Sequence, residues 1–136
     1  MEFNIRMLRE DDYDNILVGW WKDWRWTPPP KDSLPLNGTY GYMVSKDEID
    51  ICAGFLYTSN SSIAFCEFVV SNFQYKDKES RKEAIVFLIE SLCKAAKLDG
   101  YKYVWTCVKN PSLIKSYEQN DFLTSSPNCL EMIKKL

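Results

Sequence analysis

The chain has 136 residues, of which 46% are hydrophobic and 15% are aromatic. That length and apolar content suffice for one packed core, so we expect a single domain over residues 1–136. The formal net charge is −2 and the chain has no histidine. The charge argues against nucleic acid as a ligand, and the missing imidazole excludes histidine-dependent catalysis and histidine metal ligands, so we expect no metal site.

The N-terminal sequence and the cysteines bear on where the protein works. No stretch approaches the roughly 20 apolar residues of a membrane span, and the N-terminus lacks a long apolar run. The five cysteines are scattered singly without Cys-x-x-Cys spacing, which is typical of reduced structural thiols. We therefore expect a cytoplasmic protein with no membrane contact.

The first half of the chain predicts one helix and four strands. Apolar residues alternate over residues 3–7, and Asp11 and Asp12 precede an apolar stripe that contains Trp20, Trp21 and Trp24. Such a stripe indicates a helix that begins at an aspartate cap. Prolines in residues 27–35 end that helix in a surface loop. The expected strands cover residues 3–7, 40–44, 51–57 and 63–70, the last three as an antiparallel meander.

The second half alternates helices with strands. Apolar residues recur every three or four positions over residues 81–98, and Gly100 follows as a stop signal. We expect a strand at residues 101–108, a short helix at residues 111–119 and a terminal strand at residues 128–133. Strand 63–70, the long helix and strand 101–108 then form a parallel, right-handed unit.

This order of elements resembles the fold of the GNAT N-acetyltransferases, and the most specific part lies near the C-terminus. There Asn110 is followed, after six residues, by Tyr-Glu-Gln-Asn-Asp-Phe at residues 117–122. The segment is similar to the family pattern of Asn, a short helix and Tyr-Glu-x-x-Gly-Phe, with Asp121 in place of glycine. The paired Trp20 and Trp21, the proline-rich loop and residues 54–57 and 70–72 are similar to GNAT-like proteins of bacteriophage genomes. The resemblance implies an α/β fold with a mixed six- to seven-stranded sheet and helices on both faces.

The resemblance also implies an acetyl-CoA site around residues 65–81. In the family, backbone groups at the positions of Val69 and Val70 pair with the pantetheine arm, and a glycine-rich loop at a helix N-terminus binds the pyrophosphate. Here the loop has no glycine, so side chains would have to contribute instead. The cofactor-binding candidates are Val69, Val70, Lys78, Ser80, Arg81, Lys82 and Asn110.

A simpler interpretation of the same loop is a helix cap. The sequence Ser80-Arg81-Lys82-Glu83 before an apolar run matches a capping box, in which Ser and Glu occupy the donors that a phosphate would use. Asn110 is similarly typical of a residue that begins a helix before proline. The sequence leaves cofactor binding and capping open at both places.

By the resemblance, Glu67 and Tyr117 are the catalytic candidates. Burial on a central strand would raise the pKa of Glu67 towards that of a general base, although a structural Glu held by a backbone or Arg partner explains it equally well. Tyr117 matches the family's general acid for the thiolate leaving group, and a packed Tyr at a helix end is the alternative.

Four tryptophans lie within seven residues, more than one helical stripe can bury. Trp20, Trp24 and Trp26 are therefore candidates for an aromatic wall of the acceptor groove, and core packing is the alternative. The hypothesis is an acyl-CoA-dependent N-acetyltransferase that acts on an amine of a small molecule or protein in a ternary complex. A non-catalytic binding module that uses the Trp-rich face, and self-association as a homodimer through surface aromatics, remain open.

Overall fold

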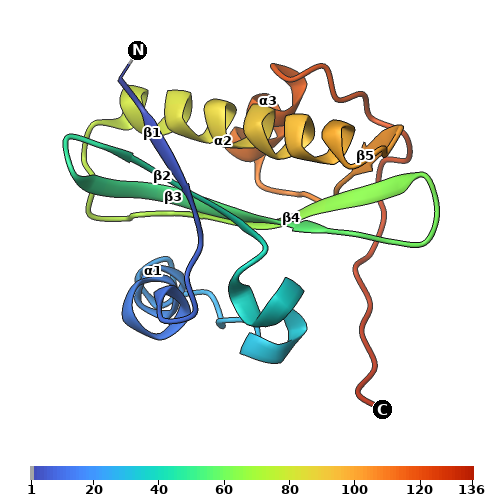
Figure 1. Ribbon diagram of the computed structural model, residues 1–136, viewed down its shortest axis with the longest axis horizontal. Helices are drawn as coiled ribbons and strands as arrows, with labels where there is room; N and C mark the ends of the chain where they lie inside the picture. Colours follow the sequence, from blue (N-terminus) through green and yellow to red (C-terminus); the bar gives the residue numbers. More distant parts are fainter. Residues whose placement is uncertain (1) are drawn as a thin grey trace.

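The computed structural model describes residues 2–136 and contains one five-stranded sheet in the order β1-β2-β3-β4-β5 (Figure 1). Strands β1 to β4 form an antiparallel meander, and β5 pairs in parallel with β4. The strands are β1 (Asn4–Met7), β2 (Gly41–Lys46), β3 (Ile49–Tyr57), β4 (Ile63–Ser71) and β5 (Tyr103–Trp105). The mixed sheet predicted from the sequence is confirmed, with five strands in place of six or seven.

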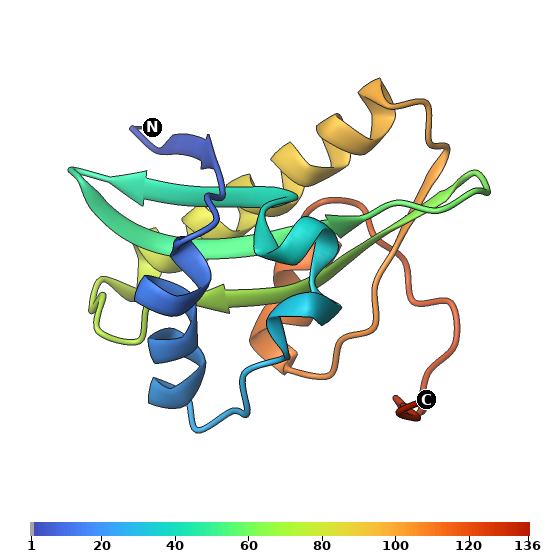
Figure 2. The same ribbon diagram turned by 60° about the horizontal axis from the view of Figure 1, so that its bottom comes forward.

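Helices cover both faces of the sheet, as predicted (Figures 1 and 2). Helices α2 (Lys78–Leu98) and α3 (Pro111–Glu118) pack on one face. The opposite face carries a π-helical turn, η1 (Tyr13–Leu17), which continues into α1 (Val18–Asp23). Two short 3-10 turns, η2 (Lys31–Ser33) and η3 (Pro35–Gly38), lie in the proline-rich segment.

The α2 face holds the larger core. The residues at three- and four-residue spacing on α2 are fully buried, and Gly100 ends the helix region with φ +92°. Gly54 of β3 allows close packing here, because a Cβ at this position would lie 3.2 Å from Leu88 and 3.1 Å from Val69. The buried α2 residues are Ser80, Ala84, Leu88, Ile89, Leu92 and Ala96.

The second core lies beneath η1 and α1. Trp20 and Trp21 pack there against Met43 and Phe55 of the central strands. The stripe predicted for the first helix is therefore correct, but its aspartate is not a helix cap. No side-chain capping bond is made by Asp12.

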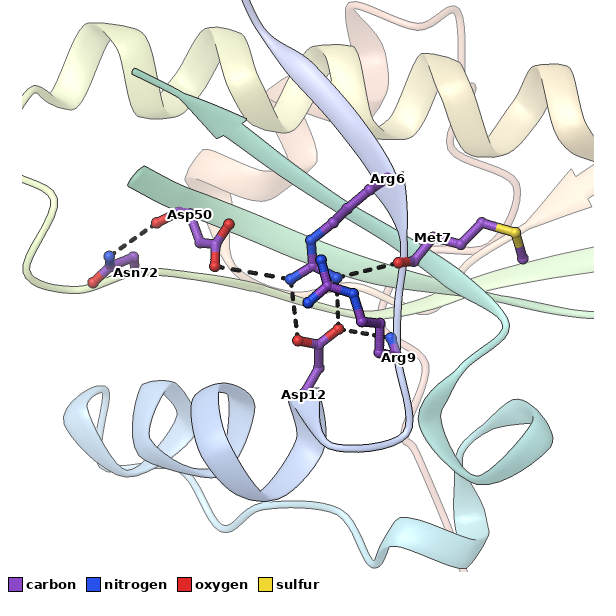
Figure 3. A network of polar contacts seen from close by, with 6 residues as sticks. All are labelled: Arg6, Met7, Arg9, Asp12, Asp50 and Asn72. Atoms are coloured by element: carbon purple, nitrogen blue, oxygen red, sulfur yellow. Dashed lines mark hydrogen bonds and ion pairs between the residues drawn. The ribbon is translucent and has the colours of Figure 1, made fainter. Parts of the chain in front are cut away.

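Asp12 instead holds the turn after β1 (Figure 3). Its carboxylate accepts hydrogen bonds from both terminal nitrogens of Arg6, at 2.8 and 3.0 Å, and from the backbone N–H of Arg9 at 2.7 Å. Burial disfavours the charge of Asp12, but these bonds outweigh it and lower its pKa. Arg6 also lies 3.9 Å from Asp50, whose carbonyl accepts from Asn72 in the loop after β4. The network thereby joins the entry to η1 with the end of β4.

The terminal strand predicted at residues 128–133 does not form. This segment has no secondary structure, and Leu130, Met132 and Ile133 are exposed. The physical reason is that β5 offers only three paired residues, and the preceding Ser-Ser-Pro-Asn turn, with Asn128 at φ +60°, directs the chain away from that edge. The segment passes the sheet edge towards the side on which α1 lies (Figure 1).

Candidate functional site

Strand β5 pairs only with the first three of the nine residues of β4, which leaves an open edge along the rest of this fourth strand of the sheet. The two strands pair from Ile63↔Tyr103 to Phe65↔Trp105, and no pairing of these strands follows in the described part of the chain. Just beyond this point the β3–β4 register shifts, and Phe68 adopts φ +55°. Since a left-handed conformation is rare for an aromatic residue, Phe68 marks a bulge that turns the strand at the opening.

Val69 and Val70 lie directly after the bulge, on the part of β4 that has no partner in β5. Val70 is buried against the α1 face, whereas Val69 packs towards α2. Their side chains are therefore structural. The edge of β4 beside them has no partner strand in β5, so an added extended chain could pair there.

Glu67 lies at the mouth of the opening and bridges the two strands. Its carboxylate accepts a hydrogen bond from the backbone N–H of Cys107 at 3.0 Å. Burial raises the pKa of Glu67 to about 7, and the nearby charge of Glu131 adds to the effect. A carboxylate with such a pKa exchanges a proton readily near neutral pH.

Tyr117 reaches the same opening from α3. Its side chain is 3% exposed, and its hydroxyl lies 3.4 Å from the Cys66 thiol and accepts a hydrogen bond from Thr106 at 3.2 Å. Burial, together with Cys66, raises the pKa of Tyr117 far above its ordinary value. Because the hydroxyl oxygen accepts from Thr106, its own proton is available to another acceptor at this position.

Two consecutive residues after β5 hold the two candidates. Thr106 donates to the Tyr117 hydroxyl, and the N–H of the adjacent Cys107 donates to Glu67. No motif in the sequence singles out Thr106 or Cys107. Their only signal was a position at the end of the strand predicted at residues 101–108, where parallel neighbours bring functional groups together.

The motif after Tyr117 has the backbone conformation that the missing glycine would adopt. Asp121 has φ +66°, and the ring of Phe122 packs edge-on against Tyr117 at 4.9 Å. The N–H of Phe122 also returns to the carbonyl of Tyr117. Aspartate tolerates the left-handed region better than most residues, so replacing glycine at this position preserved the turn.

The N-terminus of α2 is capped by its own chain. The helix begins at Lys78, and the cap is Asp77, whose carboxylate accepts from the backbone N–H of Ser80 at 3.1 Å and from its hydroxyl at 3.0 Å. The capping box predicted at Ser80–Glu83 is therefore displaced by one turn, because the helix starts three residues before Arg81. Ser80 is buried and already bonded, so it is not free to contact a phosphate.

The cations of this region differ in their surroundings. Arg81 donates to the carbonyl of Tyr75 at 2.7 Å, and its guanidinium lies 5.6 Å from the Trp24 ring centroid. Lys78 and Lys82 are exposed, and Lys82 lies 3.9 Å from Glu79. The three cations surround the first turn of α2, and only Arg81 is anchored.

Asn110 is the N-cap of α3. Its side-chain oxygen accepts from the backbone N–H groups of Ser112 and Leu113 at 2.9 and 3.1 Å. The capping alternative of the sequence analysis describes this contact. The amide group of Asn110 remains exposed at the end of the helix.

The three tryptophans predicted to form an aromatic wall do not lie together on one surface. Trp20 is 7% exposed and belongs to the core, so it cannot line a groove. Trp24 donates its indole N–H to the carbonyl of Ser71 at 2.8 Å, and Trp26 stacks on it at 5.7 Å with 44% of its surface exposed. Trp24 and Trp26 thus lie beside the end of β4 and Arg81, not beside Glu67.

Among the described residues, no helix is long and apolar enough to cross a membrane. No family model and no curated protein sequence matches the chain.

Solved structures share the fold at low sequence identity. The ribosomal-protein-S18-alanine N-acetyltransferase of Escherichia coli is 13% identical over 91% of this chain and 79% of that one, with a TM-score of 0.65. Glucosamine-6-phosphate N-acetyltransferase of Arabidopsis thaliana is 15% identical over 99% of both chains, with a TM-score of 0.60. N-acetylglutamate synthase of Neisseria gonorrhoeae, solved with coenzyme A and L-arginine, is 13% identical over 96% of this chain but only 30% of its own, with a TM-score of 0.71.

Proposed function

The chain has the GNAT acetyltransferase fold, and from this premise we propose that it is an acetyl-CoA-dependent N-acetyltransferase. The observation that carries the proposal is the opening between β4 and β5, where one carboxyl group of raised pKa and one buried hydroxyl donor are joined through Thr106 and Cys107. A general base and a general acid on the two sides of one opening are what transfer from a thioester to an amine requires.

The proposed reaction is a direct transfer in a ternary complex. Acetyl-CoA, when bound, supplies the acetyl group as a thioester. Glu67 accepts a proton from the amine as the amine nitrogen forms a bond to the acetyl carbon. Tyr117 donates its proton to the departing sulfur as the carbon–sulfur bond breaks, exchanging its contact with Cys66 for the thiolate. The products are an amide and the free thiol of CoA, and proton exchange with water restores Glu67 and Tyr117.

The unpaired edge of β4 supports a site for the pantetheine arm. Backbone groups at Val69 and Val70 have no partner strand in β5, and an extended amide-containing arm can pair with such an edge as a strand would. The Ser71 carbonyl is already bonded to Trp24. We therefore place the pairing before Ser71, next to the bulge.

The N-terminus of α2 fits a pyrophosphate less well. Asp77 is an anion at the place where the helix would attract one, and it occupies the N–H of Ser80. We propose that Lys78, Arg81 and Lys82 provide the compensating charge, with the amide of Asn110 at the neighbouring helix end. Side-chain cations can replace backbone donors in holding a phosphate.

A titration with acetyl-CoA tests the proposal. Bound ligand stabilises the folded state by about 2.7 kcal/mol at about 100 times its dissociation constant, so the melting temperature should rise with acetyl-CoA concentration. Desulfo-CoA is the control for binding, and release of free thiol in the presence of an amine panel reports transfer. A protein that neither binds acetyl-CoA nor acetylates an amine would exclude the proposed function.

One observation favours a second candidate, a GNAT-fold binding module without catalysis. Trp24, Trp26 and Phe73 form an exposed aromatic cluster next to Arg81 and Lys76, while Asp77 caps the helix that would bind the cofactor. In this case the cluster would bind the ligand, and acetyl-CoA would have no effect on the melting temperature.

The cytoplasmic location stays a prediction of the sequence; the five free thiols are consistent with a reducing compartment.

A further inference from the structure

A row of aromatic side chains crosses three strands of the sheet. Tyr57 of β3 is the register partner of Phe65 in β4, and Phe65 is the partner of Trp105 in β5. The Phe65 and Trp105 rings stack at 5.7 Å, and Phe68 approaches Tyr57 at 6.4 Å. We call Tyr57, Phe65 and Trp105 the aromatic row.

The aromatic row lies on the same face as Glu67. Cys66 and Val104 belong to the core beneath α2, so their neighbours Phe65, Glu67 and Trp105 point to the opposite face. On that face α1 packs at the other end of β4, through Trp24 and Ser71. Tyr57 packs at the edge of the α1-face core and donates its hydroxyl to the carbonyl of Ser33 at 2.8 Å, whereas Trp105 at the other end of the row is 57% exposed.

Negative charge borders the aromatic row. Glu67 lies two positions after Phe65 on β4 and is the register partner of Phe55, two positions before Tyr57 on β3, so its carboxyl group is on the same face, next to the row. Burial is the largest cause of the raised pKa of Glu67 and of Cys107, and the charge of Glu131 in the C-terminal segment adds to both. The positive charge of Lys109 opposes the rise in the pKa of Cys107. Such a face attracts an ammonium group and repels a carboxylate.

We propose that the acceptor is a primary amine that carries an aromatic or other flat apolar group and no carboxylate close to the nitrogen. The flat group stacks on the aromatic row, and the amine contacts Glu67, which lies two residues after Phe65 on the same face of β4. Aromatic faces bind both apolar rings and cationic groups, and their geometry selects a planar ligand. This acceptor class rests on the proposed acetyltransferase activity and specifies it.

Three amines test the contribution of the aromatic ring separately from the effect of a carboxylate. 2-Phenylethylamine carries both favourable features, ethylamine lacks the ring, and L-phenylalanine adds a carboxylate. We expect kcat/KM for 2-phenylethylamine to exceed that for each of the other two at least about tenfold, within the range that one apolar contact surface can discriminate. Trp105→Ala should abolish the preference over ethylamine, and Glu131→Gln should reduce the preference over L-phenylalanine.

Phe3→Ala is the matched control for Trp105→Ala. Phe3 also forms a stacked pair, with Phe87 at 6.0 Å, but it packs against the core on the α2 face. Phe3→Ala should leave both preferences unchanged. The melting temperature of Trp105→Ala should stay close to that of the unmodified chain, because more than half of this side chain is exposed.

Binding without acetyl-CoA distinguishes this inference from the proposed function. If no amine is acetylated but calorimetry detects 2-phenylethylamine binding that Trp105→Ala removes, the acceptor face is supported and the acetyltransferase is not. If ethylamine or L-phenylalanine is acetylated as well as 2-phenylethylamine, the acceptor class is overturned and the acetyltransferase stands. If Trp105→Ala alters only the oligomeric state seen by light scattering, the row is an interface between copies and the inference is wrong.

Discussion

The two ends of the open edge of β4 differ in how their polar groups are satisfied. At the bulge, burial raises the pKa of Glu67 to about 7, although its carboxylate accepts a hydrogen bond from the backbone N–H of Cys107 and is also bonded to Thr106. At the N-terminus of α2, the carboxylate of Asp77 binds both the N–H and the hydroxyl of Ser80. The first end keeps a group ready for proton transfer, whereas the second has already satisfied the groups that an anion would need. Chemistry and cofactor affinity can therefore be tested separately.

The largest expected effect is at the bulge. Glu67→Gln preserves the shape and the bond from Cys107 but cannot accept a proton, so we expect kcat to fall by about 10²- to 10⁴-fold. In the unmodified chain the rate should rise as the pH passes through about 7, where Glu67 ionises, and the variant should lose this dependence. A variant with an unchanged pH–rate profile would show that Glu67 is structural.

Tyr117→Phe removes only the hydroxyl from the other side of the opening. We expect acetyl transfer to slow at least about tenfold, with little change in acetyl-CoA affinity. The variant also loses the contacts with Thr106 and Cys66, so stability should fall by about 1 kcal/mol. Cys66→Ala is the control, since it removes one contact of the hydroxyl and keeps the proton donor. Equal rates for Tyr117→Phe and the unmodified chain would remove Tyr117 from the mechanism.

Substitution of Arg81 and of Lys82 compares an anchored cation with an exposed one at the N-terminus of α2. Each change to Gln should weaken acetyl-CoA binding severalfold, as loss of one phosphate-facing cation does. Only Arg81→Gln should also lower the stability, by about 0.5–1 kcal/mol for its contact with Trp24. Calorimetry and thermal melts give both quantities, and equal affinities in all three proteins would place the phosphates elsewhere.

Asp77→Asn tests whether the cap opposes the cofactor. Asparagine caps a helix about as well as aspartate but carries no charge, so we expect acetyl-CoA to bind about two- to fivefold more tightly while the fold is retained. Asp77→Ala removes the charge and the cap together and serves as the comparison. Weaker binding by Asp77→Asn would mean that the carboxylate helps to form the site.

The smallest expected effect concerns stability and pH. The pKa of Glu67 is raised by burial above its unfolded value, so its contribution to stability is fully present below about pH 4.5 and is lost as the pH rises through about 7. The melting temperature of Glu67→Gln, relative to that of the unmodified chain, should therefore increase between pH 5 and pH 8, by a few degrees at most. A constant difference across this range would show that the carboxyl group is not buried in solution.

Local patterns in the sequence determined the fold class, most strand positions and the long helix. The unbroken apolar run over residues 51–57 and the three- and four-residue spacing over residues 81–98 reflect how each element is buried, on both faces of the strand and on one face of the helix. The same holds for the motif at residues 117–122, where Asp121 keeps the backbone of the replaced glycine.

Tertiary structure alone decided the details that form the site. The bulge at Phe68, the contacts of Thr106 and Cys107, and the division of the tryptophans depend on partners distant in the sequence. Residues 128–133 have the composition of a strand but no edge long enough to pair with. A periodic pattern records how a segment is buried, but not which neighbour covers it, and the choice of neighbour placed Glu67 and Tyr117 at one opening.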